Sequence, residues 1–400
     1  MTTFNPRSNQ GLDPAKARPE VTIVVVPRER YQFAQASLES LYAATAYPFQ
    51  LIYVDNNSPA KLRRYLADQA QKRGFRVLRS DRYLSPNAAR NVGLQSVTSR
   101  YVVFVDNDVI FAPGWLGALV NCGQQTNATV VGSLVCQYRP LHQTIHCAGG
   151  ECMAADDLER LVRRESPASE PGGWHIHEKT YGQNRSVEDM KDQLYRQPTG
   201  FVEFHSMLVQ MEFFSQHGLL DEGFCCTKEY LDFALHVRRA GGTIYLEPAS
   251  VVTFLTHPPA PRLRWADLPY FSLRWSDGWE RSSLQHFQQK WNLADSKYFQ
   301  KRYKKLGWRR WEELIKPRLG AFSWLGPLRV KQVEKALTAW EKKLNRWWCD
   351  RTIRRTAQRL GCDPEAIATG RNYPPLEWPL QPVRPEKLAI TNPETLALKR

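Results

Sequence analysis

Short apolar runs alternate with helical patterns through the first quarter of the chain. The apolar runs, rich in Val and Ile, are VTIVVV at 21–26, LIYVD at 51–55, FRVLRS at 75–80 and YVVFVD at 101–106. The first three each precede a stretch with helical periodicity: FAQASLESLYAAT, LRRYLADQAQKRG and AARNVGLQSVTS. This alternation is typical of right-handed βαβ units, and it predicts an α/β fold with a mostly parallel sheet flanked by helices.

The pattern changes twice further along the chain. Residues 137–200 hold charged and glycine-containing segments, which fit either a mobile surface insertion or a loop over a site that helps to select substrate. Regular patterns return in FVEFHSMLVQMEFFSQHG, in YLDFALHVRRAGG and in TIYLEPASVVTF. Beyond the Pro-rich THPPAPR at 256–262 the pattern becomes mainly helical, so we place a boundary near residue 260.

Charge and tryptophan single out the part of the chain beyond this boundary. The formal net charge is +15; residues 261–400 carry 29 Lys and Arg against 14 Asp and Glu, whereas the charges over 1–260 balance. Eleven of the thirteen tryptophans lie between Trp265 and Trp378. We therefore expect a flexible leader at 1–19, an α/β domain at 20–260 that includes the 137–200 insertion, and a basic helical extension at 261–400 with a Pro-rich tail.

One segment of the extension has a clear apolar face. In KQVEKALTAWEKKLNRWW, apolar residues recur along one side of a helix and Lys or Arg occupies the rest: Val333, Leu337, Trp340, Leu344 and Trp347. Such a face can pack on the α/β domain, which is its commonest fate, or lie on an anionic membrane surface. Binding of nucleic acid is a third alternative, but no motif that reads nucleic acid accompanies the charge, so nucleic acid is not an expected partner.

The apolar runs, the N-terminus and the cysteines of the chain bear on the cellular compartment of the protein. No run of 18 apolar residues occurs, so a transmembrane helix is not expected, and the first 20 residues do not resemble a secretory signal. The eight cysteines are scattered without a CxxC pair, which favours a reducing cytoplasm. We expect a cytoplasmic protein that is peripheral on the inner face of the membrane if the extension binds lipid.

Two aspartates interrupt the fourth apolar run. Asp106 and Asp108, in YVVFVDNDVIF, stand where an unpaired ionised carboxylate would be costly. In an extended chain residues i and i+2 point alike, so both carboxylates can face one divalent cation. Asp55 ends the second apolar run, and ligands bind at the carboxyl ends of parallel strands. The sequence therefore predicts a site at that edge of the sheet.

These motifs, in this order, resemble the family 2 glycosyltransferases of the GT-A fold. The resemblance spans about residues 20–256 and rests on VTIVVV, LIYVDNNSP, NAARNVGL, FVDNDV and DEGFCCTKEYLDFALHVRRAGG. It implies a metal-assisted, inverting transfer of a sugar, of the hexosyltransferase type, from a nucleoside-diphosphate sugar to a hydroxyl of a glycan or lipid-linked acceptor, as in polysaccharide biosynthesis. The alternative is a non-catalytic binding or scaffold protein built on a degenerate domain.

The resemblance implies contacts to the nucleotide sugar for six residues: Asp55, Asn57, Asn87, Arg90, Asp106 and Asn107. The carboxylate of Asp55 can accept a hydrogen bond from a base N–H or a ribose hydroxyl, although capping the following helix is its ordinary alternative. Arg90 suits either a phosphate or a carboxylate of the core.

The resemblance implies Mn²⁺ or Mg²⁺ held by Asp106 and Asp108, with His257 as a further ligand, although Thr253 stands closer to the usual position of that histidine. Other histidines lack the spacing of a zinc site, so we expect them in loops or solvent: His142, His146, His175 and His177. Glu203, Asp221 and Glu222 are expected to be ordinary solvated charges.

The segment KEYLDFALHVRRAGG matches the acidic helix start of the family. In an inverting reaction one carboxylate there deprotonates the acceptor hydroxyl. Tyr230 stands where many members carry the aspartate base, so we expect Glu229 to be the base, with Asp232 as second candidate. The helix dipole would favour both acidic residues even without catalysis.

Overall fold

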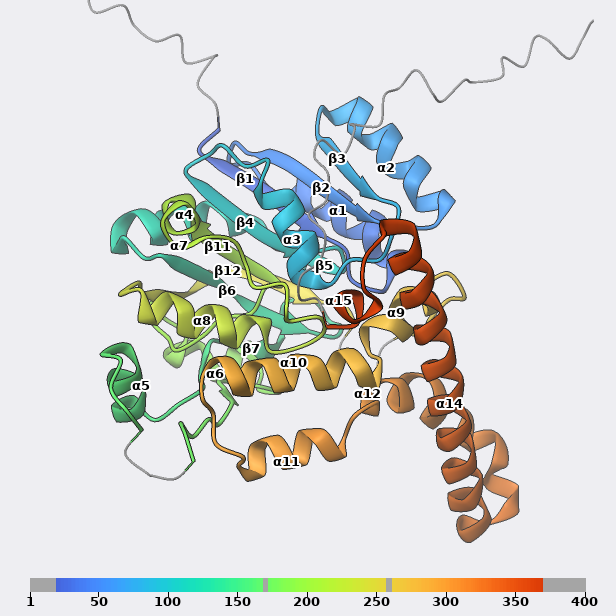
Figure 1. The fold of residues 1–400 in the computed structure, drawn as a ribbon. Coiled ribbons are helices and arrows are strands. Elements are labelled where there is room, and N and C mark those ends of the chain that lie inside the picture. Colours follow the sequence, from blue (N-terminus) through green and yellow to red (C-terminus); the bar gives the residue numbers. More distant parts are fainter. Residues whose placement is uncertain (1–18, 168–171, 257–260, 370–400) are drawn as a thin grey trace, which may run out of the picture.

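A mixed ten-stranded sheet forms the centre of the molecule in the computed structural model, which describes residues 19–167, 172–256 and 261–369 (Figure 1). The strand order is β10-β12-β6-β11-β4-β1-β2-β3, with β5 paired to β12 and β7 to β6. The strands of this sheet are β1 (Val21–Val26), β2 (Gln50–Asn56), β3 (Arg76–Ser80), β4 (Tyr101–Asp106), β5 (Val109–Phe111), β6 (Val130–Gln137), β7 (Thr144–Cys147), β10 (Gln197–Pro198), β11 (Ser206–Gln210) and β12 (Ile244–Phe254).

The first half of the sheet has the predicted βαβ arrangement. The four apolar runs form β1 to β4, and β3-β2-β1-β4 pair in parallel. The helices between them are α1 (Ala34–Ala44), α2 (Ala60–Arg73) and α3 (Pro86–Leu94). Gly93 lets α3 approach β1, because a Cβ there would lie 2.3 Å from a methyl group of Val24. The carboxyl ends of β1, β2 and β4 therefore meet at one edge, where Asp55 and Asp106 lie.

The second half of the sheet is not parallel throughout. β11 lies antiparallel between β4 and β6, whereas β6 and β12 pair in parallel with a bulge between Glu247 and Val251. The helices of this half are α4 (Trp115–Thr126), α7 (Met211–His217) and α8 (Glu229–Arg239). Because β11 runs against β4, the segment that enters β11 lies at the same edge as the carboxyl end of β4.

Much of the 137–200 insertion packs on the body. It contributes β7 and β10 to the large sheet, the pair β8 (Gly150–Glu151) and β9 (Lys179–Thr180), and the helices α5 (Ala155–Val162) and α6 (Val187–Met190). Trp174 and Ile176 are buried in the main hydrophobic core. These contacts favour the second interpretation of the insertion, in which it borders a site.

The region after residue 260 is helical, as expected. Its helices are α9 (Leu268–Arg274), α10 (Asp277–Lys290), α11 (Lys297–Lys304), α12 (Trp308–Arg310), α13 (Lys316–Leu319), α14 (Pro327–Leu360) and α15 (Pro364–Thr369), with a π-helical turn at Trp311–Ile315. Phe287, Trp291 and Phe299 belong to the same hydrophobic core as the strands. α10 lies between α8 and α11, whereas the first half of α14 projects away from the sheet (Figure 1).

The expected apolar face of α14 does not pack throughout. Trp340, Leu344 and Trp347 expose 64%, 44% and 58% of their surface. The residues of α14 that are buried lie on another face, at Asn345, Cys349 and Ala357. The prediction that this apolar face packs on the α/β domain is therefore wrong for Trp340, Leu344 and Trp347.

Among the described helices, none combines the length and the apolar character that crossing a membrane requires. The leader, apart from residue 19, lies outside the described residues, as do the Pro-rich tail and the predicted ligand His257.

Candidate active site

The site starts at the carboxyl ends of β1 and β4. Val26 pairs with Asp106 across the two strands, so the residues that follow each strand stand side by side. The Arg28 backbone N–H donates to Asn107 Oδ1 at 2.6 Å, and its guanidinium donates to Asp106 Oδ2 at 3.1 Å. Asn107 thus fixes the chain after β1 and points Arg28 at Asp106.

Asp106 and Asp108 are both fully buried. Asp106 Oδ2 lies 2.8 Å from His205 Nδ1, in addition to its bond from Arg28, and Asp108 Oδ2 accepts a 2.6 Å bond from the Thr256 hydroxyl. The Oδ1 atom of each carboxylate has no hydrogen-bond partner among the described residues. Two buried carboxylate oxygens of this kind suit a hard divalent cation such as Mn²⁺ or Mg²⁺.

The two carboxyl groups titrate in opposite directions. Burial raises the pKa of Asp106, but the charges of Arg28 and His205 outweigh it and bring that pKa down to about 2. Burial and the neighbouring charge of Asp106 raise the pKa of Asp108 above its usual value. Asp106 therefore already has cationic partners, whereas Asp108 lacks the positive charge that would favour its ionised form.

Arg90 lies between two acidic groups. Its guanidinium is 3.9 Å from Asp106 and 3.9 Å from Glu229, and it stacks on the Phe204 ring at 3.9 Å. Asn87 Oδ1 accepts from Arg90 at 3.0 Å and so orients it. Burial lowers the pKa of Arg90 to about 10, which leaves it charged at neutral pH. The core-carboxylate alternative for Arg90 is therefore present in the structure. A phosphate contact stays a prediction, for which Nε and one terminal nitrogen have no hydrogen-bond partner in the described structure.

The acidic residues at the start of α8 have different surroundings. Glu229 lines a cavity together with Arg90. Asp232 does not line it: its carboxylate binds Lys290 at 2.8 Å and the Trp291 indole N–H at 2.7 Å. Burial raises the pKa of Asp232 despite the charge of Lys290. The structure thus brings only Glu229 to the group around Arg90.

Tyr230, in the usual position of the base, also lines this cavity, but its hydroxyl already has a partner. Its hydroxyl donates to Glu178 of the insertion. Burial, together with the charge of Glu178, raises the pKa of Tyr230 well above its ordinary value, so the phenol keeps its proton. Tyr230 is therefore a hydrogen-bond donor in the support of α8.

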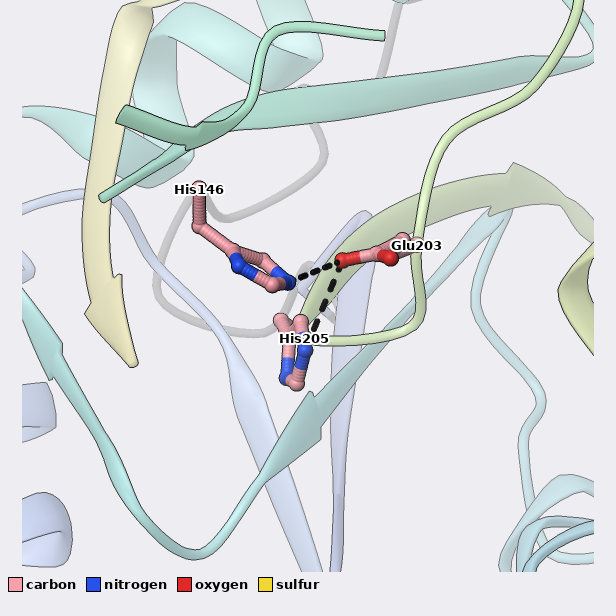
Figure 2. A group of neighbouring side chains, drawn as sticks. All are labelled: His146, Glu203 and His205. Carbon is pink, nitrogen blue, oxygen red and sulfur yellow. Dashed lines mark ion pairs between the residues drawn. The ribbon is translucent and has the colours of Figure 1, made fainter. Parts of the chain in front are cut away.

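Three further ligand-type side chains converge beside Asp106 (Figure 2). His146 comes from β7, and Glu203 and His205 come from the segment that enters β11. Glu203 Oε2 lies 3.0 Å from His146 Nε2 and 3.5 Å from His205 Nε2. Burial raises the pKa of Glu203, but both histidines lower it, to about 2.

One cavity of about 180 Å³ lies at the centre of this site. Arg28, Arg90, Glu203, His205 and Glu229 line it from the α/β body, and Arg274, Trp275 and Arg309 line it from the helical region. Asp106 and Asp108 lie directly behind Arg28 and His205 rather than on the wall itself. The basic extension therefore contributes to the site, although we expected it only to pack or to bind a separate partner.

Asp55 and Asn57 stand apart from this cavity. Asp55 is paired with Arg79 and accepts a 2.9 Å bond from the Ser58 backbone N–H, and Asn57 Oδ1 accepts from Arg79 at 3.4 Å. Asp55 does not cap the following helix, because α2 begins after Pro59 and has no side-chain cap. A nucleotide contact for Asp55 and Asn57 stays a prediction.

The sequence prediction was wrong about Glu203 and His146. We expected a solvated charge and a loop histidine, but both border the cavity and pair with each other. We overlooked His205 altogether. A signal was present: Glu203 and His205 are two residues apart in FVEFHS, a spacing that would place them on the same side of an extended chain, although the structure has a turn at residues 204–205. Their partner His146 comes from a distant strand, which only the tertiary structure brings near.

The site thus combines paired aspartates at a strand end of an α/β sheet with an arginine-lined cavity beside them. Residues 22–146 match the model of glycosyl transferase family 2. The match includes Asp55, Arg90, Asp106 and Asp108, and it ends before Glu203 and Glu229.

Two relatives are each similar to about a third of this chain. A segment of 132 residues is 31% identical to an uncharacterized protein of Sinorhizobium fredii, and one of 121 residues is 28% identical to the O-antigen biosynthesis protein RfbC of Myxococcus xanthus. These segments cover 32% and 30% of this chain but only 14% and 10% of those proteins.

Two solved structures are similar at a distance. GalNAc-T7 with UDP, GalNAc and Mn²⁺ has a TM-score of 0.45 at 16% identity over 72% of this chain and 56% of that one. The mannosyltransferase PcManGT from Pyrobaculum calidifontis, in complex with GDP-Man and Mn²⁺, has a TM-score of 0.42 at 15% identity over 84% of this chain and 85% of that one. Both TM-scores are below 0.5, so neither structure supports a conclusion about this protein.

Proposed function

We propose that the protein is an inverting, hexosyltransferase-type glycosyltransferase that moves a sugar from a nucleoside-diphosphate sugar to a hydroxyl of a glycan or lipid-linked acceptor. The family match of residues 22–146 supports the reaction class. The cavity beside β4 supports the kind of donor, because its walls carry the charges that a diphosphate and a reacting hydroxyl need.

The observation that carries the proposal is the set of cavity arginines. Each has a buried N–H group without a hydrogen-bond partner in the described structure: Arg28, Arg90, Arg274 and Arg309. A buried donor without a partner is costly, and an arginine next to a cavity finds its best partner in a phosphate. The four guanidinium groups therefore fit the diphosphate of a nucleotide sugar.

The carboxylates behind the arginines fit a cation. Asp106 Oδ1 and Asp108 Oδ1 are the oxygens that would hold Mn²⁺ or Mg²⁺, and both lack a hydrogen-bond partner among the described residues. Bound there, such an ion would neutralise charge on the leaving diphosphate. Asp108, whose pKa is raised by burial and by Asp106, would gain most from a positive charge.

Glu229 is the group we assign to the acceptor. An inverting transfer needs a base that takes the proton of the acceptor hydroxyl as its oxygen attacks the anomeric carbon opposite the leaving diphosphate. Glu229 borders the cavity and lies 3.9 Å from Arg90, whose charge stabilises the carboxylate. Arg90 thus lies between the proposed base and Asp106.

An anionic membrane surface is the second binding partner that we propose for the protein. Trp340, Leu344 and Trp347 are exposed on α14, and the helix also exposes Lys343 and Arg346. Exposed tryptophan beside cationic side chains suits an anionic lipid surface, where a lipid-linked acceptor would reside.

The competing function is a binding or scaffold protein. Tyr230 favours it, because a protonated tyrosine held by Glu178 occupies the usual position of the base. Slow hydrolysis of a donor sugar by the purified protein, lost on chelation, would exclude this alternative. Donor binding without hydrolysis or transfer to any acceptor would support it.

Donor binding tests the proposal directly. UDP-, GDP-, dTDP- and CMP-sugars are screened by thermal shift with and without Mn²⁺; a donor at about 100 times its Kd should stabilise the protein by roughly 2.7 kcal/mol. Asp106→Ala and Asp108→Ala should abolish the Mn²⁺-dependent shift, whereas the exposed control Asp156→Ala should retain it. If both cavity variants still respond as the wild type does, the proposal is wrong.

A further inference from the structure

Glu203 holds two histidines at the spacing of metal ligands (Figure 2). Its Oε2 is 3.0 Å from His146 Nε2 and 3.5 Å from His205 Nε2, and the three ligand atoms all lie within 4.8 Å of one another. Two ligands that each lie about 2.1 Å from a tetrahedral metal ion are about 3.4 Å apart. The observed separations therefore need little adjustment to accept one ion.

The other nitrogen of each ring faces an acceptor. His146 Nδ1 is 3.1 Å from Gln137 Oε1, and the amide of Gln137 is fixed because its Nε2 donates to Asn184 Oδ1 at 2.6 Å. His205 Nδ1 is 2.8 Å from Asp106 Oδ2. Metal-binding histidines are oriented in this way, by an amide or carboxylate oxygen that takes the second N–H.

These outer contacts decide which atoms meet at the centre. Both Nε2 atoms point toward the Glu203 carboxylate, so three ligand-type atoms meet at one point. Phe254 packs on the His205 ring, with 4.1 Å between ring centroids, and helps to keep it in this orientation.

We propose that His146, Glu203 and His205 form a binding site for a divalent transition-metal ion, with Gln137 and Asp106 orienting the two rings. Two imidazoles and one carboxylate select ions such as Zn²⁺ or Co²⁺ over Mg²⁺, which prefers oxygen ligands. Three protein ligands leave a fourth position open. The site borders the cavity lined by Arg28 and Arg90, so that position suits an oxygen of an anionic ligand.

This site is separate from the one assigned to Asp106 Oδ1 and Asp108. Asp106 contributes its Oδ2 to orient His205, and Asp108 has no contact with the three ligands among the contacts given above. The inference does not rest on the proposed glycosyl transfer, because binding of the ion alone requires no sugar nucleotide.

The test uses the full-length protein, stripped of metal and titrated with Co²⁺. We expect one equivalent to bind with the visible absorption of a tetrahedral nitrogen- and oxygen-ligated ion, and Zn²⁺ to displace it. His146→Gln and His205→Gln should each weaken binding by at least about tenfold. The matched control His177→Gln, which changes an exposed histidine of the same insertion, should bind as the wild type does.

Asp108→Asn separates the two cation sites, since it should leave the Co²⁺ spectrum unchanged. Loss of the spectrum in that variant with retention in both histidine variants would overturn the inference. So would a wild-type protein that binds no Co²⁺, which would make the three groups a proton-sharing network only. Protection of wild-type histidines by Zn²⁺ against diethyl pyrocarbonate is a check that needs no variant; absence of protection would also count against the site.

Discussion

At the scale of single residues, two carboxylates less than one turn apart on α8 have different partners. Glu229 borders the cavity near Arg90, whereas Asp232 is bound to Lys290 and Trp291. The first is the base that we propose for the acceptor hydroxyl, and the second ties α8 to α10. The two candidates for the base can therefore be separated by what their loss affects.

Glu229→Gln is expected to keep the donor-induced thermal shift and to lose transfer activity by about 10²–10⁴-fold, because the amide cannot take a proton. Steady-state transfer rates with a saturating donor measure this. Glu159→Gln, an exposed change in the insertion, is the control. Full turnover by Glu229→Gln would exclude Glu229 as the base.

Asp232→Asn should instead act on stability. The amide cannot pair with the charge of Lys290, which then keeps Asp221 as its anionic partner, so we expect the unfolding free energy to fall by about 1–3 kcal/mol. The transfer rate of the folded variant should stay near that of the wild type. A variant with normal stability and no activity would reverse the assignment of the two carboxylates.

At the scale of elements, Glu178 joins three segments: the insertion, the start of α8 and α11. It lies in the insertion before β9 and binds Lys228 and Tyr230 at the start of α8, as well as Tyr298 and Arg302 of α11. Burial raises the pKa of Glu178, but Lys228 and the other partners outweigh it and lower that pKa to about 2. The ionised carboxylate thus holds the helix start that carries Glu229.

This contact predicts a dependence of stability on pH. The folded-state pKa of Glu178 is below its unfolded value of 4.5, so its contribution is fully present above pH 4.5 and is lost as the pH falls toward 2. The loss amounts to about 3 kcal/mol. Glu178→Gln should flatten the decline of unfolding free energy over this range, measured by urea unfolding; the exposed control Glu188→Gln should not.

The exposed apolar face of α14 leads to a second prediction at the scale of elements. Replacing Trp340, Leu344 and Trp347 with Ser should abolish binding to vesicles that contain phosphatidylglycerol, because the inserted apolar area is lost. Wild-type binding should weaken with salt. Trp265→Ser removes another exposed tryptophan, outside α14, and is the control. Equal binding to neutral vesicles, or preference for RNA over lipid, would contradict the membrane assignment.

At the scale of the whole molecule, the cavity belongs to both parts of the chain. Arg274 and Arg309 complete the arginine set, and Phe287 and Phe299 share the core of the sheet. We had placed a boundary near residue 260, and the region after it cannot be removed without cutting through this core. A fragment ending at residue 260 should therefore fail to unfold cooperatively and should not show the donor-induced thermal shift; a cooperative fragment with normal donor binding would refute this.

The periodicity of the sequence alone determined β1 to β4, their helices and the position of Asp106 and Asp108 at a strand end, because these depend on contacts between neighbours along the chain. It also placed Glu229 at the start of a helix. Only the tertiary structure decided which carboxylate faces the cavity, since Asp232 is bound by Lys290, a residue 58 positions away.

The same reason explains the groups that the sequence left unrecognised. His146, Glu203 and His205 converge from β7 and from the approach to β11, and Arg274 and Arg309 arrive from the helical region. No local pattern encodes these meetings, because they result from an antiparallel strand inserted into the sheet and from helices packed against its edge. The sequence by itself determined the strands and the acidic edge of the site. The packing of distant segments decided which arginines reach the cavity, which residues line it and how the separate histidine cluster assembles.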